Sequence, residues 1–147
     1  MNLKAFLKLP YKDKLFFCVN FIFSGLIRIV IKVVSYKTLS QYFGCYVGKK
    51  IVVPILKASK VTQTIRIKKV VALACRFTPW QSNCLVQAIL AIFWCQRKGI
   101  PYSLFIGVVK DNSQKKIRSH AWVTSGSVAI SGGYAFNTYH VIMCYVG

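Results

Sequence analysis

The stretch that most restricts the fold is the run CLVQAILAIFWC, from Cys84 to Cys95, in which Gln87 is the one polar residue. Asn83 before it is a favourable N-cap and Gly99 after it a favourable C-cap, so the run predicts a helix over 84–98. A helix that is apolar on all sides leaves no face for water. We therefore expect it at the centre of its domain, with the rest of the chain arranged around it.

Strand-like segments follow this helix. PYSLFIGVV (101–109) predicts a strand, KDNSQKK (110–116) a loop and IRSHAWVT (117–124) a second strand. Ser125-Gly126 suits a two-residue hairpin turn into a third strand, SVAIS (127–131), and YHVIMCYV (139–146) is a candidate fourth. Helices followed by an antiparallel meander predict the α+β class.

The chain before the central helix is basic and reads as helical. Residues 1–43 have helical character, GCYVGKK (44–50) and Pro54 interrupt it, and 62–77 predicts a second amphipathic helix that ends before Pro79. We expect two regions, a basic helical N-terminal region over 1–61 packed on the core, and the core itself over 62–147.

One N-terminal segment is apolar enough to raise the question of a membrane. Leu15–Ile27 is uncharged but much shorter than the roughly 20 residues a membrane span requires, and no cleavage site for a signal peptidase follows it. Asn20, Ser24, Arg28 and Lys32 recur at every fourth position, which places one polar stripe on an apolar helix. A helix packed into the protein is the first interpretation, and a helix lying on an anionic membrane is the second.

The charge balance excludes some classes of site. The chain has 21 Lys and Arg residues against 2 acids, Asp13 and Asp111, for a net charge of +19. Two separated carboxylates cannot supply a glycosidase pair or a Ca²⁺ cage. The positive field attracts an anionic lipid surface, nucleic acid or an acidic protein, although a merely solvated basic surface gives the same composition. Because the aromatic residues are not interleaved with basic ones, we expect no nucleic-acid partner.

The six cysteines are not arranged as metal ligands. No C-x-x-C pair is present, and the spacings match no zinc template. Most lie within apolar runs, where a thiol behaves as a small hydrophobic group. We expect reduced thiols, a cytoplasmic location and no metal.

Cys84 differs from the other cysteines because it opens the central helix. Unpaired N–H groups and the helix dipole at that end favour a thiolate and can receive an oxyanion. A nucleophilic thiol needs a base, and His120 on the second predicted strand is better placed than His140. The alternative interpretation is a small core cysteine and a hydrogen-bonded core histidine.

The predicted hairpins give a register around His120. A turn at Ser125-Gly126 pairs His120 with Ser131, and a turn near Ser113 sets it opposite Gly107. Asp111 then lies four residues further along its strand, about 13 Å away. The chain therefore supplies no carboxylate beside its histidine, and Gly107 leaves space next to the ring.

Part of the chain, within about Thr78–Gly133, resembles the leader peptidases of lasso-peptide biosynthesis. The resemblance lies in two stretches, PWQSNCLVQAILAIFWCQRKGIPYSLFIGVVKD and SHAWVTSGSVAISGG. That family has a transglutaminase-like, or papain-like, cysteine-protease core. The motifs are Trp80 four residues before Cys84-Leu85, then Gly99-Ile100-Pro101, Ile106-Gly107-Val108, His120-Ala121-Trp122 and Ser131-Gly132-Gly133.

The resemblance implies hydrolysis of one peptide bond, which releases the leader from a ribosomally made precursor. Cys84 takes the place of the nucleophile and His120 that of the general base, while Trp80, Gln81 and Trp122 fall at substrate-binding positions. The implied partners are the precursor, a small leader-recognition protein and an ATP-dependent cyclase. No cofactor is implied, and a peripheral position at the inner face of the membrane is a further expectation.

The sequence departs from this family pattern at the group that orients the histidine. Many relatives carry Asp where this chain reads ISGG (130–133). Ser131, a backbone carbonyl or a partner-supplied group are the candidate substitutes, in that order. A catalytically degenerate scaffold of the maturation complex and a basic membrane-associated protein are the alternative functions.

Overall fold

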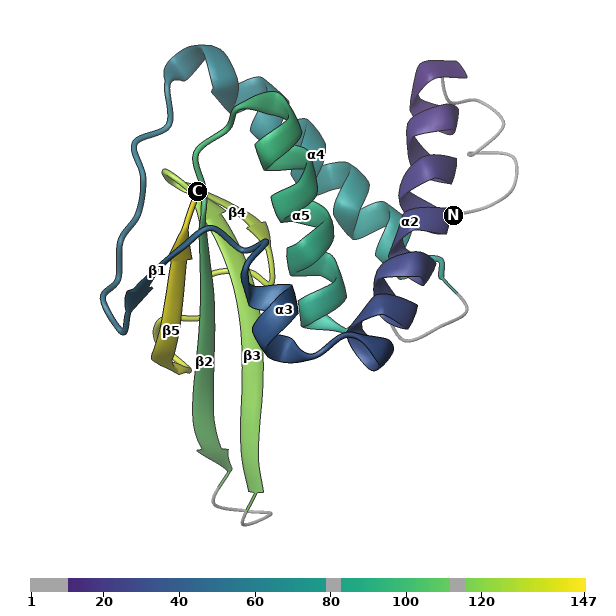
Figure 1. The fold of residues 1–147 in the computed structure, drawn as a ribbon. Coiled ribbons are helices and arrows are strands. Elements are labelled where there is room, and N and C mark those ends of the chain that lie inside the picture. The colour runs from purple at the N-terminus through teal and green to yellow at the C-terminus, as the bar shows by residue number, and fades with distance from the viewer. Residues whose placement is uncertain (1–10, 79–82, 112–115) are drawn as a thin grey trace.

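The computed structural model describes residues 11–78, 83–111 and 116–147, in which helices cover one face of an antiparallel sheet (Figure 1). This arrangement confirms the predicted α+β class. The elements are α2 (Tyr11–Val33), α3 (Tyr36–Ser40), β1 (Cys45–Gly48), α4 (Ala58–Arg76), α5 (Cys84–Lys98), β2 (Ser103–Asp111), β3 (Lys116–Ser125), β4 (Val128–Ser131) and β5 (His140–Val146).

Helix α5 is the central helix that the apolar run predicts. The Asn83 side chain accepts a hydrogen bond from the Val86 N–H, and Gly99 ends the helix in the left-handed conformation at φ 57°. The helix contributes six buried side chains to the core, namely Val86, Ala88, Leu90, Ala91, Ile92 and Cys95. Helix α4 confirms the second amphipathic helix and begins four residues earlier than the predicted Thr62.

The sheet is not the simple meander that the strand order predicts. Its order is β1-β5-β2-β3-β4, so β2, β3 and β4 form a meander. Strand β5 returns to pair with the edge of β2 that faces away from β3. Strand β1, from the segment that interrupts the N-terminal helices, pairs with β5. The predicted boundary between two regions at residue 61 stays a prediction. Strand β1, which precedes that boundary in the chain, is part of the sheet.

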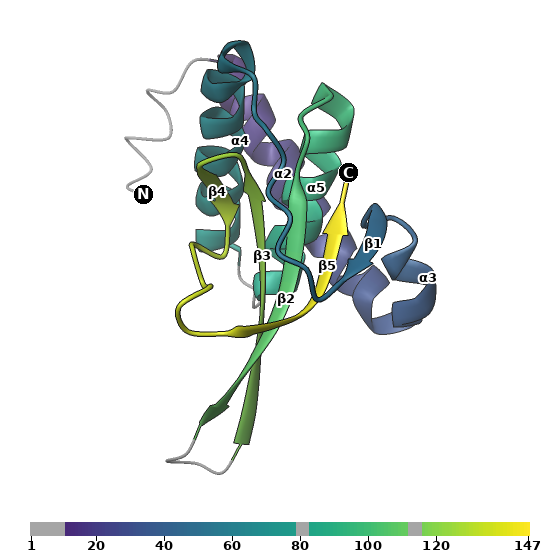
Figure 2. The same ribbon diagram turned by 90° about the vertical axis from the view of Figure 1, so that its left-hand side faces the viewer.

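The two faces of the sheet bury different side chains. Leu104, Ala121 and Val123 pack with α5 in the main core. Phe105 and Trp122 point to the other face, where a smaller cluster includes residues from the chain between β4 and β5. Figure 2 shows this connection crossing the sheet. Because side chains alternate along a strand, neighbouring residues of β3 lie on opposite faces.

Candidate active site

Cys84 is the first residue of α5, and it is half-buried at the edge of the main core. The Asn83 side chain binds the Val86 N–H at 3.1 Å, and the Asn83 carbonyl accepts from the Gln87 N–H at 3.2 Å. These bonds fix where the helix begins. The thiol therefore sits at the positive end of the helix dipole, beside backbone N–H groups of the first turn that lie outside the regular helix ladder.

Four of the other five cysteines are either inert or exposed, and the fifth, Cys75, is half-buried in the last turn of α4. Burial raises the pKa of Cys95 to about 12, and it also raises the pKa of Cys144. Both thiols are therefore poor nucleophiles at neutral pH. Cys18 and Cys45 are exposed, which the position of Cys18 within an apolar run did not predict. Helix position and burial together single out Cys84.

His120 lies midway along β3 and is half-buried. Its Nε2 is 2.8 Å from the Gly132 carbonyl oxygen, which can only accept, so Nε2 carries a hydrogen and donates it. The Trp122 ring stacks on the imidazole with centroids 5.9 Å apart, and the Tyr139 ring lies 5.1 Å away. Two rings and one carbonyl therefore hold the imidazole.

The predicted pairing of His120 with Gly107 is confirmed. The space that Gly107 leaves is not open, however. A Cβ there would lie 2.9 Å from Cη2 of Trp122 and 3.0 Å from the His140 carbonyl oxygen. The glycine thus allows the Trp122 indole to pack across β2, and it does not enlarge the pocket beside the imidazole.

The predicted pairing of His120 with Ser131 is wrong, because the turn between β3 and β4 occupies Gly126-Ser127. Ser125 pairs with Val128, and after a register shift Val123 pairs with Ser131. Cross-strand partners share a face, so Ser131 lies on the helix-covered face with Val123, while His120 lies on the other. Ser131 is buried, and its hydroxyl has no hydrogen-bond partner among the described residues.

Gly132 makes the hydrogen bond to the imidazole for which Ser131 was the first candidate. It follows β4 at φ +71°, and a Cβ on it would lie 2.6 Å from the Ala121 carbonyl oxygen and 2.9 Å from the Trp122 Cα. Only glycine combines this conformation with so close an approach to β3. The backbone carbonyl, the second candidate of the sequence analysis, is therefore the group that binds the imidazole.

The structure does not bring the Cys84 thiol into hydrogen-bonding contact with His120; no such bond is present within the described residues. The thiol lies on the helix-covered face and the imidazole on the other face. They do lie at similar heights along the sheet. Helix α5 runs beside β2 and β3 (Figures 1 and 2), and its 15 residues span about 22 Å, or about six strand residues. Six residues along β2 from Ser103 is Val109, two residues past Gly107, the strand partner of His120.

The edge of β3 beside His120 has no strand neighbour in the described part of the chain, because β4 pairs only with Val123, Thr124 and Ser125. The thiol and the imidazole thus lie on opposite faces of the sheet, and the Gly132 backbone lies against β3 at this edge. The described residues contain no cluster of three or more groups that could hold a metal ion.

The expected substrate-binding residues have different positions. Trp80 and Gln81 lie outside the described residues. Trp122 is fully buried and stacks on Phe105 with centroids 5.6 Å apart, so its indole packs in the core beneath His120. Tyr139 was not expected at the site, since nothing in its sequence context signals a contact with β3.

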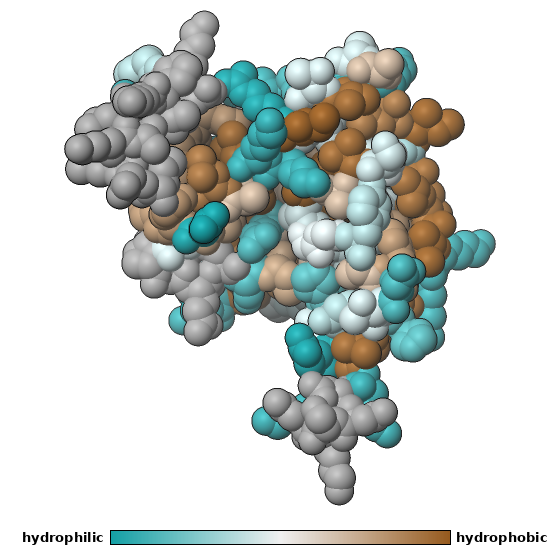
Figure 3. All heavy atoms as spheres, turned by 180° about the vertical axis from the view of Figure 1, so that it is seen from behind, coloured by the Kyte–Doolittle hydropathy of each residue, from teal (hydrophilic) through white to brown (hydrophobic). Residues whose placement is uncertain are grey.

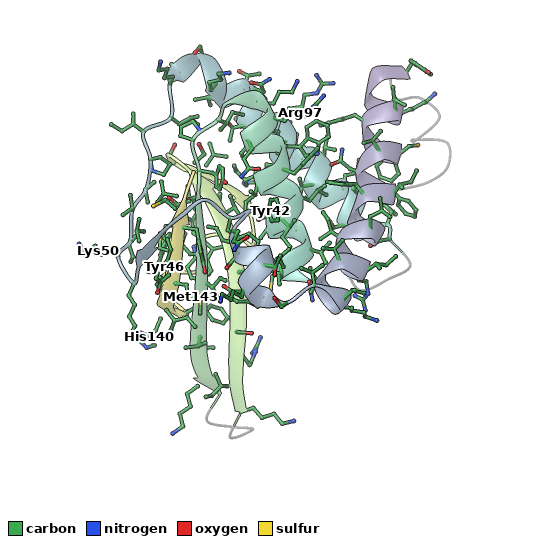
Figure 4. The ribbon with its side chains drawn as sticks, viewed as in Figure 1. Tyr42, Tyr46, Lys50, Arg97, His140 and Met143 are labelled. Atoms are coloured by element: carbon green, nitrogen blue, oxygen red, sulfur yellow. The ribbon has the colours of Figure 1, made fainter. Side chains whose placement is uncertain are left out.

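His140, the second histidine, is exposed at the start of β5. Figure 4 shows it on the side of the sheet that carries Tyr46 and Met143. In the strand order β5 is separated from β3 by β2. The preference for His120 over His140 as the partner of the Cys84 thiol stays a prediction.

Comparison with known protein families agrees with the observed fold. The transglutaminase-like superfamily matches residues 36–144, from α3 into β5. No curated protein and no solved structure matches the chain significantly. The family match spans most of the chain and includes Cys84, His120 and Gly132. The chain therefore belongs to the transglutaminase-like superfamily.

Proposed function

We propose that this protein is a cysteine peptidase that removes the leader from a ribosomally made lasso-peptide precursor. Cys84 is the nucleophile and His120 the general base. Within a transglutaminase-like domain, the observation that carries the proposal is the hydrogen bond from His120 Nε2 to the Gly132 carbonyl. The leader-recognition protein and the ATP-dependent cyclase are the proposed partners in the cytoplasm.

This hydrogen bond determines which nitrogen acts as the base. A carbonyl oxygen accepts only, so Nε2 keeps its hydrogen, and in the neutral ring Nδ1 is the unprotonated nitrogen. An orienting carboxylate performs the same task in related catalytic triads, where it fixes the tautomer. A carboxylate also stabilises the imidazolium ion, and a neutral carbonyl does so less strongly. We therefore expect a functional but slower enzyme than one with an acidic third member.

The chemistry follows from these positions. Nδ1 of His120 removes the thiol proton of Cys84, and the thiolate adds to the scissile carbonyl carbon. N–H groups at the start of α5 stabilise the resulting oxyanion. The imidazolium then donates its proton to the leaving amine as the C–N bond breaks, which releases one fragment and leaves a thioester. Water, deprotonated by the same imidazole, hydrolyses the thioester and regenerates the thiol.

The mechanism requires the thiol and the imidazole to approach around the unpaired edge of β3. Catalytic hydrogen bonds are often long or misaligned without substrate and tighten in the substrate complex. Residues 79–82 precede the helix, and the resemblance assigns substrate binding to Trp80 and Gln81. We expect precursor bound there to complete the site.

The test is cleavage of the precursor in the presence of the recognition protein, followed by mass spectrometry. Cys84→Ala and His120→Ala are each expected to reduce the rate at least about a thousandfold, because they remove the nucleophile or the base. Cys45→Ala and His140→Ala are the matched controls, one thiol and one imidazole that are exposed elsewhere, and both are expected to retain cleavage. Normal cleavage by both Cys84→Ala and His120→Ala would contradict the proposal.

A catalytically degenerate scaffold is the second candidate, and the separation of thiol and imidazole by β3 favours it. Thiol labelling at neutral pH distinguishes the two functions. In a Cys18→Ser/Cys45→Ser background, which removes the exposed thiols, an activated Cys84 reacts faster than Cys75 and loses that advantage when His120 is changed to Ala. Equal labelling rates, with and without His120, would support the scaffold.

A further inference from the structure

Helix α2 presents an aliphatic surface to the solvent. Six side chains spaced alternately four and three residues apart are exposed along one side of the helix: Leu15 at 53%, Val19 at 44%, Ile22 at 62%, Leu26 at 50%, Ile29 at 60% and Val33 at 79%. We call these six residues the outer face of α2. At 3.6 residues per turn they lie within an arc of about 80°, roughly a quarter of the circumference. An apolar surface of this length on a water-soluble domain marks an interaction site.

The polar side of the same helix faces the protein. Asn20 and Ser24 are fully buried, and Asn20 Oδ1 accepts a hydrogen bond from the Trp94 indole of α5 at 2.6 Å. The Asn20 amide also donates to the Phe16 carbonyl at 2.6 Å. A helix that faces water has the opposite arrangement. In a lipid environment polar side chains turn toward the protein interior, and apolar ones face outward.

Two further observations separate α2 from the catalytic domain and connect it with anionic lipid. The family match begins at residue 36, so α2 lies outside it. Exposed Lys32 lies in the last turn of α2, exposed Lys37 lies in α3, which follows it, and the chain carries a net charge of +19. Basic side chains beside an apolar helix face attract the negative surface of a bilayer.

We propose that the outer face of α2 docks the protein on an anionic lipid bilayer, with the helix lying in the plane of the interface. The inference goes beyond the proposed peptidase function and does not depend on it. A protein docked in this way holds its sheet on the aqueous side of the interface.

The packing of α2 favours docking over spanning. By length and composition Lys14–Val33 is apolar enough to cross a membrane, with a mean hydropathy of 1.9. However, α2 packs against α4, whose Arg66 guanidinium lies 5.8 Å from the centre of the Phe16 ring. The exposed Lys68 and Lys69 lie on the same helix. A transmembrane α2 would draw these cations into hydrocarbon, whereas an interfacial α2 leaves them in water.

The charge also argues against a second copy as the occupant. Two chains that each carry +19 repel one another, and the sequence of α2 contains one acid, Asp13, to offset its basic residues. A bilayer containing anionic lipid supplies both the apolar environment and the opposite charge.

The experiment is co-sedimentation of the full chain with vesicles made of equal parts phosphatidylcholine and phosphatidylglycerol. Vesicles of phosphatidylcholine alone test the charge requirement. Ile22→Ser/Ile29→Ser is expected to weaken binding at least about tenfold, because two side chains no longer insert into the apolar layer. Lys32→Glu/Lys37→Glu is expected to weaken binding to the anionic vesicles and to reduce its sensitivity to salt.

Ile55→Ser is the matched control. Ile55 is 90% exposed in a second apolar stretch, 51–55, that lies across the molecule from α2 at the hydrophobic right-hand edge of Figure 3. The Ile55→Ser variant is expected to bind the vesicles as the unchanged chain does. Leu26→Trp is expected to show fluorescence quenching by brominated lipid, and Ile55→Trp is not. Retained binding by Ile22→Ser/Ile29→Ser, or absence of vesicle binding together with a dimer in sedimentation velocity, would overturn the proposal.

Discussion

At the scale of single residues, Gly132 determines how the imidazole is held. Its carbonyl accepts from His120, and its position against β3 leaves no space for a side chain. The following residue, Gly133, has almost the same φ, +70°, but a Cβ on it would meet no atom within 4 Å. Comparing substitutions at these two glycines therefore distinguishes the effect of backbone strain from that of a steric clash.

Gly132→Ala is expected to lower the free energy of unfolding by about 3 kcal/mol, from left-handed strain plus the clash with the Ala121 carbonyl. Gly133→Ala carries the strain alone and is expected to lose about 1 kcal/mol. Urea denaturation measures both changes. Nitrogen-15 spectra of the imidazoles are expected to show a loss of the Nε2–H tautomer of His120 in Gly132→Ala only. Equal effects of the two substitutions would contradict the steric contact.

At the scale of elements, one buried hydrogen bond fixes the side of α2 that faces α5. Asn20 on α2 and Trp94 on α5 are bonded at 2.6 Å, and the Phe16 ring of α2 meets the Trp94 ring edge-on at 4.5 Å. Burying an amide without a partner is costly, so the bond specifies the rotation of α2 about its axis. This rotation exposes the outer face of α2.

Asn20→Ala is expected to lower the free energy of unfolding by about 2 kcal/mol, because the Trp94 indole N–H loses its acceptor. Trp94→Phe removes the donor instead. The double variant is expected to be less destabilised than the sum of the two single ones, with a coupling energy of about 1 kcal/mol. Additive changes in urea denaturation would show that the pair does not hold the two helices together.

The elements also show where sequence patterns stop being sufficient. The caps of α5 were predictable because Asn83 and Gly99 act within one turn of the helix. The register of β3 against β2 followed from the loop length. The register of β4 did not, because a turn displaced by one residue and a later shift moved Ser131 to face Val123. A displacement of one residue reverses the face of every following side chain.

At the scale of the whole molecule, buried ionisable groups make stability depend on alkaline pH. Burial raises the pKa of Cys95 to about 12, and it also raises the pKa values of Cys144 and Tyr102. In the unfolded chain a thiol ionises near about pH 8.5. Between those values the folded chain holds more protons than the unfolded chain. The contribution of the Cys95 thiol to the free energy of unfolding is thus fully present below about pH 8.5, and it is lost as the pH rises toward 12.

The free energy of unfolding is therefore expected to fall between about pH 8 and pH 10, with Cys95 alone contributing about 2 kcal/mol. Urea denaturation under reducing conditions measures the change. Cys95→Ala is expected to reduce the pH dependence even though it lowers the stability itself. Cys45→Ala, which removes an exposed thiol, is expected to leave the pH dependence unchanged. If Cys95→Ala keeps the pH dependence of the unchanged chain, ionisation of this thiol is not the cause of the fall in stability.

The sequence by itself determined the features that depend on near neighbours: the α+β class, the limits of α5, the place of Cys84 at its first residue and the pairing of His120 with Gly107. Only the tertiary structure decided that β5 returns beside β2, that Gly132 binds the imidazole and that α2 turns its polar side inward. Each of these depends on segments far apart in the chain. Local patterns specify turns, caps and periodicity, whereas the side of an element that becomes buried is set by the surface it meets.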